Sequence, residues 1–530
     1  MYNKIIPSSY EVGAGLRFDH LDFWQEQRTI PPLELLADNI LNHEGGDYLY
    51  KISQIVERTS STLHCTTLNI AGTDPIDTGR VEDLRRLKEQ WGAYAISDHL
   101  CFSQKSGGRV FDLLPPRYTT SEVARISERI LAIQEILAGY LTIENISSYV
   151  SYDNHMSEAE FISALVQETG CKVLLDVNNV FVSCHNNGTS PDKELAKFPS
   201  QAIQYYHVAG HRAQEGLLVD THDQLISDSV LRLLGKAMNL HGIKPVIFER
   251  DDNHTSTVMV SELNRIHSFL GEYCHEPSPP TEVILPQFSH DTNKNQQRAL
   301  EEASFIAAIH ASDPAGGSPV KLPMGVVDGA AMIIYQQAFV ASLTETPLTT
   351  VFAPLASYFD GDILRHLLWQ YFQEYPPNQL ELVDCLRGFP SFIETYDTNL
   401  GVLAEVATIC LYQWDLLSSA DRENTPLNLE RLETIFLHRT SQLVHCPQGG
   451  LSIWLEEDGH ELGMFIKQPG PGGEVCLVPL PREALAPCQS LVKGASLLEV
   501  CHNPEVQDTI SPQIFEDILK TIAMGMCHVL

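Results

Sequence analysis

Positively charged residues are scarce in this chain of 530 residues, which has 35 Lys and Arg against 68 Asp and Glu and a formal net charge of -33. Nucleic acids and anionic membranes are bound mainly through lysine and arginine contacts to phosphate groups. The composition therefore argues against nucleic acid or a membrane as the partner. Apolar residues make up 43% of the chain, which is enough for packed cores and too much for a disordered protein.

Cysteine motifs and long hydrophobic runs are also missing. None of the 12 cysteines forms a CxxC pair, and no set of cysteines and histidines has zinc-finger spacing, which excludes a cysteine-rich structural zinc site. No run of about 18 apolar residues is uninterrupted, and the N-terminal MYNKIIPSSY has no hydrophobic signal core. We therefore expect a cytoplasmic protein with reduced thiols and no membrane span.

Short apolar segments alternate with helical patterns in the first half of the chain. The segments cover residues 11–18, 33–39, 61–65, 93–100, 140–145, 172–179, 203–211 and 245–252. Strands that alternate with helices of this length form parallel βαβ units, and eight units in about 270 residues fit a TIM barrel. We predict an α/β fold with a TIM (β/α)8 barrel over residues 1–275.

Proline, serine, threonine and asparagine are concentrated in residues 276–297, which we predict to be a linker. Helical periodicity after the linker, including a helix at 400–419, predicts an α-helical domain over residues 298–425. The pattern then changes to short strands at 450–458, 461–468 and 474–480, and two helices close the chain, the last at 511–526. We predict a small α+β domain over residues 426–530.

Polar residues collect at the ends of the predicted barrel strands, where a TIM barrel carries its active site. A single histidine there is more often a core residue, and a single carboxylate usually caps the next helix. Here, however, six consecutive strands contribute such residues at one end, and the segment VDTHD adds two more. The strand-end residues are His64, Asp98, His99, Glu144, Asp176, His207 and Glu249, and the segment adds Asp220 and His222.

This set of carboxylates and imidazoles predicts a metal site. Without a cation the buried groups would repel one another and stay desolvated. Carboxylates and neutral imidazoles are ligands of iron, manganese and zinc, and composition does not choose among these metals. The number of ligands is too large for one ion, so we expect two or three.

Several motifs resemble the multinuclear non-haem iron-dependent oxidases, a methanobactin-oxidase-like family formerly known as a domain of unknown function. They include ISDHLCFS, TIENISSY, LLDVNNVFVS, YYHVAGH, VDTHD and FERDDN, and the similarity covers residues 8–270. The resemblance implies a TIM barrel of the xylose-isomerase type with two or three irons in mixed Fe(II)/Fe(III) states. It also implies that O2 is used to modify cysteine, or another residue, in a ribosomally made precursor peptide.

The resemblance also implies roles for individual residues. The implied iron ligands are His64, His99, Glu144, Asp176, Asn179, His207, Asp220, His222 and Glu249, of which Asn179 is added by the motif alone. Asp98, Arg17, His211 and Arg250 would contact the substrate or support the ligands, and ordinary ion pairs at the barrel mouth explain these four residues equally well. His185 is expected in a solvent-facing loop.

The part after the linker resembles the partner protein of these oxidases, a family once described as DNA-binding. The matching motifs are AAMIIYQQAFVASLTETPLTTVFAPLASYF and LHRTSQLVHCPQGGLSIW. The resemblance implies a fused domain that recruits the peptide, and the acidic composition argues against DNA. A small sheet with an open edge could bind the leader of the peptide as an added strand. We expect a precursor peptide as the partner, and the sequence leaves a homo-oligomer open.

Two other classes of function compete with this interpretation. A zinc- or manganese-dependent isomerase or endonuclease of the xylose-isomerase-like barrels would also gather Glu, Asp and His at strand ends. Turnover without O2 would favour that alternative, and the negative net charge weakens its endonuclease version. A scaffold or peptide-binding protein without catalysis would have to explain nine clustered ligands.

Overall fold

The computed structural model describes residues 11–41, 46–214, 216–251, 254–273, 295–312, 322–328, 332–397, 400, 403–404, 407–408, 410–411 and five short strands beyond them. Two compact units make up the chain. The first, called the barrel unit, comprises Met1–Leu41 and Ile52–Val340. The second, called the C-terminal unit, comprises Asn42–Lys51 and Ala341–Leu530.

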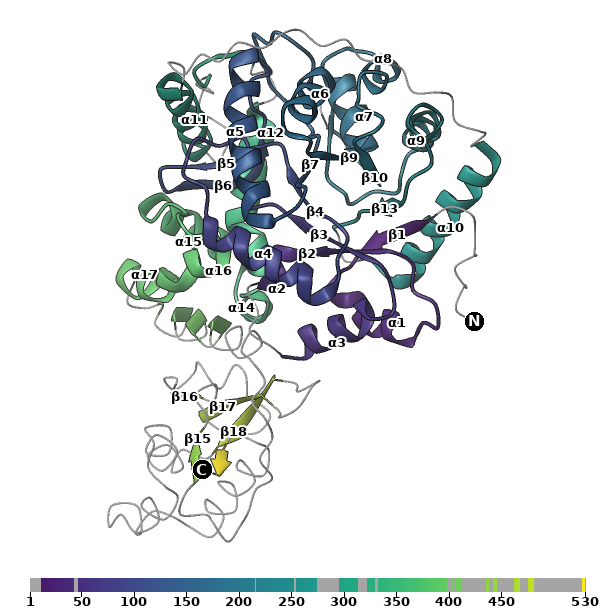
Figure 1. Cartoon of the computed structure of the whole chain (residues 1–530). Helices are drawn as coiled ribbons and strands as arrows, with labels where there is room; N and C mark the ends of the chain where they lie inside the picture. The colour runs from purple at the N-terminus through teal and green to yellow at the C-terminus, as the bar shows by residue number, and fades with distance from the viewer. Residues whose placement is uncertain are drawn as a thin grey trace, which may run out of the picture. The chain divides into compact units, whose positions relative to one another are not determined.

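A closed barrel of eight parallel strands forms the centre of the barrel unit (Figure 1). Its strands are β1 (Val12–Gly15), β2 (Leu33–Leu36), β3 (Ser61–Cys65), β4 (Ile96–His99), β7 (Thr142–Glu144), β9 (Lys172–Asp176), β10 (Ile203–Val208) and β13 (Val246–Phe248). Each strand pairs with the next one along the chain, and β1 closes the ring by pairing with β13. All eight lie within the predicted segments, so the TIM-barrel prediction is confirmed.

A buried apolar cluster joins several strands and consists of Ala95, Leu174, Tyr205 and Ile247. Side chains alternate between the two faces of a strand, so residues two positions apart point to the same side. Asp176, His207 and Glu249 each stand two positions after a member of this cluster. The apolar cluster therefore forms the floor beneath the polar strand ends.

Helices cover the outside of the barrel (Figure 1). Side-chain caps start α4 (Thr78–Trp91), α5 (Thr120–Leu137), α6 (Glu158–Thr169) and α9 (Asp228–His241), and at α6 Ser157 and Glu160 form a capping box. The remaining helices of this part of the chain are η1 (Phe18–His20), α1 (Leu21–Glu26), α2 (Ala37–Leu41), α3 (Gly46–Val56), α7 (Val177–Asn186), α8 (Pro191–Leu195) and α10 (Ser256–Tyr273).

Helix α7 corrects the sequence prediction for residues 177–186, which placed the end of a strand and a loop there. The strand β9 ends at Asp176, and the Asp176 side chain accepts a hydrogen bond from the backbone N–H of Asn179. This bond is an N-terminal cap, and it starts the helix one residue after the strand. His185 lies in the last turn of α7 and is exposed, so its expected contact with solvent is confirmed.

Short antiparallel strands extend from the C-terminal ends of three barrel strands. A hairpin of β5 (Phe102–Lys105) and β6 (Gly108–Leu114) follows β4, and β8 (Ser151–Tyr152) follows β7. A second hairpin, β11 (Arg212–Gln214) and β12 (Leu217–Val219), follows β10. Because they continue from the C-terminal ends of parallel strands, these elements surround the mouth of the barrel.

The barrel unit continues beyond residue 298, where the sequence predicts a new domain. It includes α11 (Asn295–His310), β14 (Val326–Asp328) and α12 (Met332–Thr344) as far as Val340. Helix α11 packs against the β5–β6 hairpin, and β14 pairs with β8 in an antiparallel sheet. The first elements after the predicted linker therefore pack with the barrel rather than with the helices that follow.

The C-terminal unit begins with helices and ends with strands. Its helical part contains α13 (Thr346–Thr349), α14 (Ala353–Tyr358), α15 (Gly361–Glu374), α16 (Leu382–Cys385), η3 (Leu386–Gly388) and α17 (Phe389–Tyr396). Its strands are β15 (Ile435–Leu437), β16 (Gln442–His445), β17 (Leu462–Lys467), β18 (Val475–Leu480) and β19 (Cys527–Val529), of which β16, β17 and β18 form one antiparallel sheet. The predicted strand at 450–458 and the predicted last helix at 511–526 lie outside the described residues, as does most of the linker and of the helix at 400–419.

No helix in the described part of the chain is long and apolar enough to cross a membrane. Six described cysteines have free, buried thiols, namely Cys65, Cys101, Cys171, Cys184, Cys385 and Cys410. Burial raises the pKa of the Cys65 and Cys101 thiols well above the usual range. These two thiols therefore stay protonated and unreactive at neutral pH.

Candidate metal centre

The polar residues predicted at the strand ends lie together at the mouth of the barrel. Six of them are contributed by the ends of β3, β4, β7, β9, β10 and by the residue after β13, and they are His64, His99, Glu144, Asp176, His207 and Glu249. All six side chains are buried. Their donor atoms fall into two groups, each compact enough to hold a metal ion, and Glu144 belongs to both.

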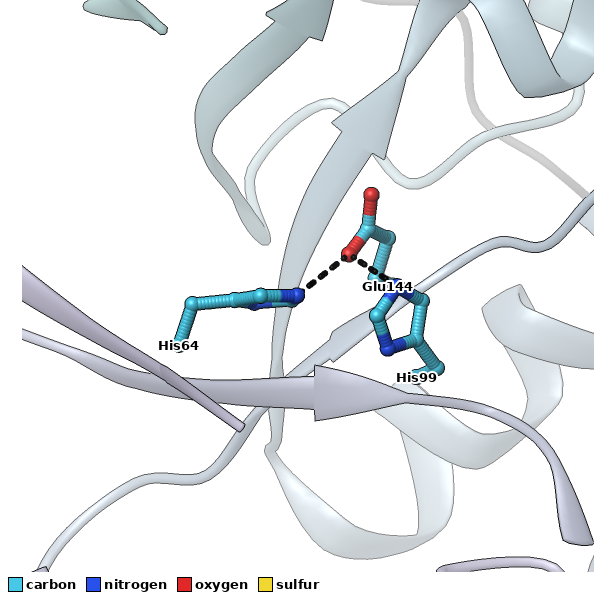
Figure 2. Close-up of side chains that lie close together, drawn as sticks. All are labelled: His64, His99 and Glu144. Atoms are coloured by element: carbon cyan, nitrogen blue, oxygen red, sulfur yellow. Dashed lines mark ion pairs between the residues drawn. The ribbon is translucent and has the colours of Figure 1, made fainter. Parts of the chain in front are cut away.

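The first group consists of His64, His99 and Glu144 (Figure 2). The Oε2 atom of Glu144 lies 3.6 Å from Nε2 of His64 and 3.2 Å from Nε2 of His99. The other ring nitrogen of His64, Nδ1, lies 2.9 Å from the hydroxyl of Ser97, which fixes the orientation of the ring. Two imidazole nitrogens and one carboxylate oxygen thus face a common point, a ligand set that suits iron, manganese or zinc.

The second group consists of Glu144, Asp176, His207 and Glu249. The Nδ1 atom of His207 lies 3.2 Å from Oε1 of Glu144 and 3.1 Å from Oε2 of Glu249. Glu144 therefore presents Oε2 to the first group and Oε1 to the second. A carboxylate in this position can bridge two metal ions.

Several donor atoms of the two groups have no hydrogen-bond partner although they are buried. They include Oε2 of Glu144, Oδ2 of Asp176 and Nδ1 of His207. A buried polar atom without a partner costs about 1–3 kcal/mol, and more when it is charged. A divalent cation would satisfy these atoms together, so the residues fit a metal centre.

Electrostatic repulsion supports the same interpretation. Burial, followed by the charges of Glu144 and Asp220, raises the pKa of Asp176 well above its usual range. Burial opposes ionisation of Glu249 as well, but His207 beside it holds the pKa of Glu249 well below the usual range. Asp176 is thus the carboxyl group of the centre that most needs a cation in order to ionise.

Asp176 serves the fold and the site with different oxygen atoms. Its Oδ1 accepts the hydrogen bond from Asn179 N–H at 2.6 Å that caps α7, which leaves Oδ2 for the site. The side chain of Asn145 holds the backbone of Asp176 from both sides, because Nδ2 donates to its carbonyl and Oδ1 accepts from its N–H, each at 2.9 Å. This clamp fixes the position of the carboxylate.

Asn179, which the motif adds as a ligand, lies in the first turn of α7. Its Oδ1 accepts a hydrogen bond from the Ser147 hydroxyl at 2.7 Å, and its Nδ2 donates to the carbonyl of Asn145 at 3.0 Å. Both ends of the amide are therefore engaged within the protein. Metal binding through Asn179 would use the second lone pair of Oδ1, and it stays a prediction.

Asp220 and His222 form a pair beside the second group. Nε2 of His222 lies 2.9 Å from Oδ1 of Asp220, and Nδ1 lies 3.2 Å from Asp251 and 3.7 Å from Glu249. His222 has a φ of 49°, in the left-handed region that non-glycine residues rarely adopt. Its N–H donates to the carbonyl of Gly210, and its carbonyl accepts from Asp251 N–H, so the backbone is held on both sides.

Gly210 allows the loop that carries this pair to approach β10. A Cβ atom at residue 210 would lie 2.1 Å from the carbonyl oxygen of Gln224, which no side chain can tolerate. The absence of a side chain lets Gly210 accept the hydrogen bond from His222 N–H. Gly210, the glycine of the YYHVAGH motif, therefore helps to position His222.

Asp98 and Arg17, which were predicted to contact the substrate or support the ligands, hold neighbouring groups in place around the centre. The carboxylate of Asp98 accepts from His99 N–H at 2.6 Å and from Leu68 N–H at 2.7 Å, so it ties the loop after β3 to β4. Arg17 donates to Asp251 at 2.5 Å and to the carbonyl of Arg250 at 3.1 Å. These contacts assign both residues to positioning in the described structure.

The other two predicted contacts, His211 and Arg250, lie on the side of the mouth near Asp220. Nδ1 of His211 lies 2.7 Å from Oδ1 of Asn178, whose Nδ2 donates to Asp220 at 2.6 Å. Burial lowers the pKa of His211, so this imidazole is neutral at neutral pH. Arg250 donates to the carbonyl of Asp223 at 3.2 Å.

Glu34, the second residue of β2, is a site residue that the sequence interpretation missed. Its Oε1 lies 2.6 Å from Nε2 of His207, and its Oε2 accepts from the hydroxyls of Tyr205 at 2.8 Å and Thr62 at 3.0 Å. All of these groups are buried. Glu34 thus holds the ring of His207 so that Nδ1 faces the second group. A carboxylate inside an apolar strand, the signal that revealed Asp176, was also present at Glu34.

The barrel matches a known family of proteins in sequence. Residues 11–271 match the sequence model of a family described as RiPP precursor modification enzyme MbnB/TglH/ChrH. A UPF0276 protein of Shewanella loihica is 34% identical over 263 residues, which cover 49% of this chain and 94% of the relative. A UPF0276 protein of Chromobacterium violaceum is 35% identical over 265 residues, which cover 49% of this chain and 94% of the relative.

Solved structures resemble the barrel at low sequence identity. A xylose isomerase-like TIM barrel protein from Mycobacterium smegmatis, in complex with magnesium, has a TM-score of 0.37 and 11% identity, and the alignment covers 50% of this chain and 98% of that protein. Endonuclease IV from Thermus thermophilus has a TM-score of 0.36 and 13% identity, with 49% of this chain and 99% of the enzyme covered.

Proposed function

This chain belongs to the family of RiPP precursor modification enzymes MbnB/TglH/ChrH, and on that premise we propose that it is an O2-dependent multinuclear non-haem iron enzyme. Its substrate is a ribosomally made precursor peptide, in which it oxidatively modifies cysteine or another residue. The proposal rests on the position of Glu144. Its Oε2 faces the first group of ligands, and its Oε1 faces the second. A carboxylate that faces two groups of donor atoms in this way would suit a centre with more than one metal ion.

Iron fits the donor atoms of the centre. The two groups offer only imidazole nitrogens and carboxylate oxygens, a set that iron shares with manganese and zinc. The choice of iron, and of two or three ions, rests on the resemblance to the iron-dependent oxidases. When bound, iron would supply the one-electron chemistry by which O2 is reduced and the peptide is oxidised.

The surrounding residues would orient the ligands and limit the access of water. Ser97 and Glu34 each bind the ring nitrogen that faces away from the centre, in His64 and His207 respectively. Such outer partners fix the tautomer and orientation of a metal-binding histidine. The apolar floor beneath the site removes water from one side, which strengthens the interactions among the charged groups.

His211 is a suitable acceptor for the proton of a substrate thiol. The amide of Asn178 is oriented by its bond to Asp220, so its oxygen faces Nδ1 of His211. The proton of the neutral imidazole therefore sits on Nδ1, and Nε2 keeps a lone pair. In this proposal Nε2 of His211 takes the thiol proton as the cysteine enters the mouth, and the thiolate that remains would be suited to bind a metal ion held by the centre.

The C-terminal unit would recruit the peptide. Its three-stranded sheet ends in the edge strands β16 and β18, and a strand edge can pair with an extended peptide through backbone hydrogen bonds. We assign to this sheet the binding of the leader segment, while the barrel binds the residue that is modified. The predicted domains, with a linker at 276–297, are part of this proposal.

Co-expression with a cysteine-containing peptide encoded next to the gene tests the proposed function. Mass spectrometry should show a change in the mass of the peptide with air and none without O2, and the purified protein should contain iron. His64→Ala and Glu249→Ala should lower both iron content and turnover, whereas Glu82→Gln on the exposed face of α4 should change neither. Full iron and full turnover in both ligand variants would refute the assignment. Zinc or manganese with turnover independent of O2 would favour the isomerase or endonuclease alternative.

A further inference from the structure

The elements that follow residue 295 in the barrel unit contact the short strands that leave the barrel mouth. Helix α11 packs against the β5–β6 hairpin, and β14 pairs with β8 through Val326 and Tyr152. The hairpin follows β4 and β8 follows β7, the two strands that end with His99 and Glu144. This added segment therefore contacts the loops that leave the first group of ligands.

Arg298 anchors the added segment to the barrel. Its side chain is buried and lies 3.4 Å from Glu122 at the start of α5 and 3.5 Å from Glu302 on its own helix. The guanidinium also lies over the ring of Phe102 in β5, 5.1 Å from the ring centre. Separating this buried arginine from its carboxylates and the aromatic ring would leave its charge unpaired, so the contact stabilises the packing of α11 on the barrel.

A row of aromatic rings continues from this anchor toward the metal centre. Phe102 of β5 contacts Phe305 of α11 with ring centres 5.8 Å apart, and Phe305 contacts Tyr335 of α12 at 5.7 Å. Tyr335 contacts Tyr149, in the loop between β7 and β8, at 5.2 Å. All three contacts are edge-to-face, the arrangement that aromatic pairs prefer, and Tyr335 is fully buried.

Hydrogen bonds connect the end of this row to the Asp220–His222 pair. The backbone N–H of Tyr149 donates to the hydroxyl of Tyr335 at 3.3 Å. The backbone N–H of Asp220 donates to the hydroxyl of Tyr149 at 2.9 Å, and Oδ1 of Asp220 lies 2.9 Å from Nε2 of His222. Tyr335 thus holds Tyr149, and Tyr149 holds the residue that orients His222.

We propose that Tyr335 is a positioning residue of the metal centre, which acts through Tyr149 on the Asp220–His222 pair. The proposal rests on the proposed function, because it assumes that this pair binds a metal ion or supports one. It makes α11, β14 and α12 as far as Val340 a built-in part of the site, rather than only a connection to a recruiting domain. Three contacts, through Tyr149 and Asp220, connect Tyr335 to His222, so we expect an effect on metal affinity and not on which residues bind the metal.

A double-mutant cycle on the full-length protein tests this role. The variants are Tyr335→Ala, Asp220→Ala and the two together, and the measurement is Fe(II) affinity without O2, determined by competition with a chelator. Outer partners of metal ligands change affinity by about 10–100-fold, and we expect Tyr335→Ala to cost about tenfold in the chain with Asp220. In the Asp220→Ala background the same substitution should cost less than about twofold, because the residue through which it acts is missing.

Tyr206→Phe is the matched control, because Tyr206 is another buried tyrosine of the barrel unit, and its hydroxyl also bonds to the backbone, where it donates to the carbonyl of Gly242 at 2.8 Å. It should leave Fe(II) affinity unchanged. Tyr335→Phe keeps the ring contacts but removes the hydroxyl that accepts from Tyr149 N–H, so it should lose part of the affinity that Tyr335→Ala loses. Equal losses from Tyr335→Ala with and without Asp220 would overturn the proposal, since they would show a general effect on packing. Failure of the proposed function would instead appear in the wild-type chain, as an unchanged peptide mass in air, while the coupling between the two residues persisted.

Discussion

Replacing Glu34 by glutamine tests how much the outer partners of the histidines contribute to the centre. Oε1 of Glu34 lies 2.6 Å from Nε2 of His207, and Oε2 accepts the hydroxyls of Tyr205 and Thr62. In Glu34→Gln the amide oxygen can still accept from His207, and the amide nitrogen can donate to the two hydroxyls if these turn into acceptors. The shape of the site is thus kept while one negative charge is lost.

Two independent arguments give the same magnitude. A hydrogen bond to a charged group contributes about 1.5–3 kcal/mol. Loss of an outer partner of a metal-binding histidine costs about 10–100-fold in metal affinity, and at about 1.4 kcal/mol for each factor of ten this corresponds to about 1.4–2.8 kcal/mol. We expect Glu34→Gln to lie near the lower end, because glutamine keeps the hydrogen bond. Glu34→Ala should lie at the upper end, because it removes the carboxylate that His207, Tyr205 and Thr62 all contact.

Competition with a chelator in the absence of O2 measures the Fe(II) affinity of both variants, and urea unfolding of the metal-free protein checks that they fold. Glu82→Gln, at an exposed position on α4, is the control for the loss of one charge and should match the wild type. The reasoning is wrong if folded Glu34→Gln and Glu34→Ala both bind Fe(II) within about twofold of the wild type, since each lacks the carboxylate on His207.

Three further predictions follow from particular contacts. Glu144→Ala should lower metal content, measured by elemental analysis, more than His64→Ala, because Glu144 belongs to both groups and His64 to one, and equal losses would contradict a bridging role. Proline at Leu443 or at Val444 in edge strand β16 removes one backbone N–H. Neighbouring N–H groups point to opposite sides of a strand, so one of these two groups faces β17 and the other faces the open edge. One of the two variants should therefore weaken leader binding about tenfold without disrupting the sheet, and unchanged affinity in both would count against pairing at β16. Burial lowers the pKa of His241 to about 4, below the value of about 6.5 in the unfolded chain. The neutral imidazole therefore contributes its full share to the free energy of unfolding above about pH 6.5, and this share is lost as the pH falls toward 4. Urea unfolding should show a loss of about 2 kcal/mol between about pH 7.5 and 5 that His241→Gln removes.

The barrel could be predicted because its strands carry a strong and repeated signal. Each of the eight strands is a short apolar run between helical patterns, and the structure places every one inside its predicted segment. Helix α7 escaped prediction because residues 177–186 are rich in β-branched and asparagine residues, which have low helix propensity, and a cap at Asp176 outweighs that preference. The packing of α11 and β14 on the barrel escaped as well, because partners such as Glu122 and Tyr152 lie more than a hundred residues earlier in the sequence.

The candidate site was predicted to a similar extent and for a similar reason. The rule that working residues stand at the C-terminal ends of barrel strands selects His64, Glu144 and His207 from sequence alone. It does not reveal which oxygen of Glu144 faces which group, nor that Ser97 and Glu34 orient the rings, because these depend on side-chain rotamers and on contacts between strands. Glu34 carried a signal in the sequence, a carboxylate within the run LELL, but no local pattern pairs it with His207, 173 positions further along the chain.

The charge balance of the site limits the number and the valence of the ions that it can hold. Five carboxylates face one another there: Glu34, Glu144, Asp176, Asp220 and Glu249. Asp251 does not add to them, because Arg17 pairs with it. Histidines that bind metal are neutral, so only the ions can offset the five negative charges. Two divalent ions leave one charge uncompensated, an Fe(II)/Fe(III) pair leaves none, and three divalent ions leave an excess positive charge that one substrate thiolate would neutralise. In the proposed iron centre, a mixed-valence pair would therefore balance the formal charge of these carboxylates, and a third ion would bind more tightly when the peptide thiolate is present.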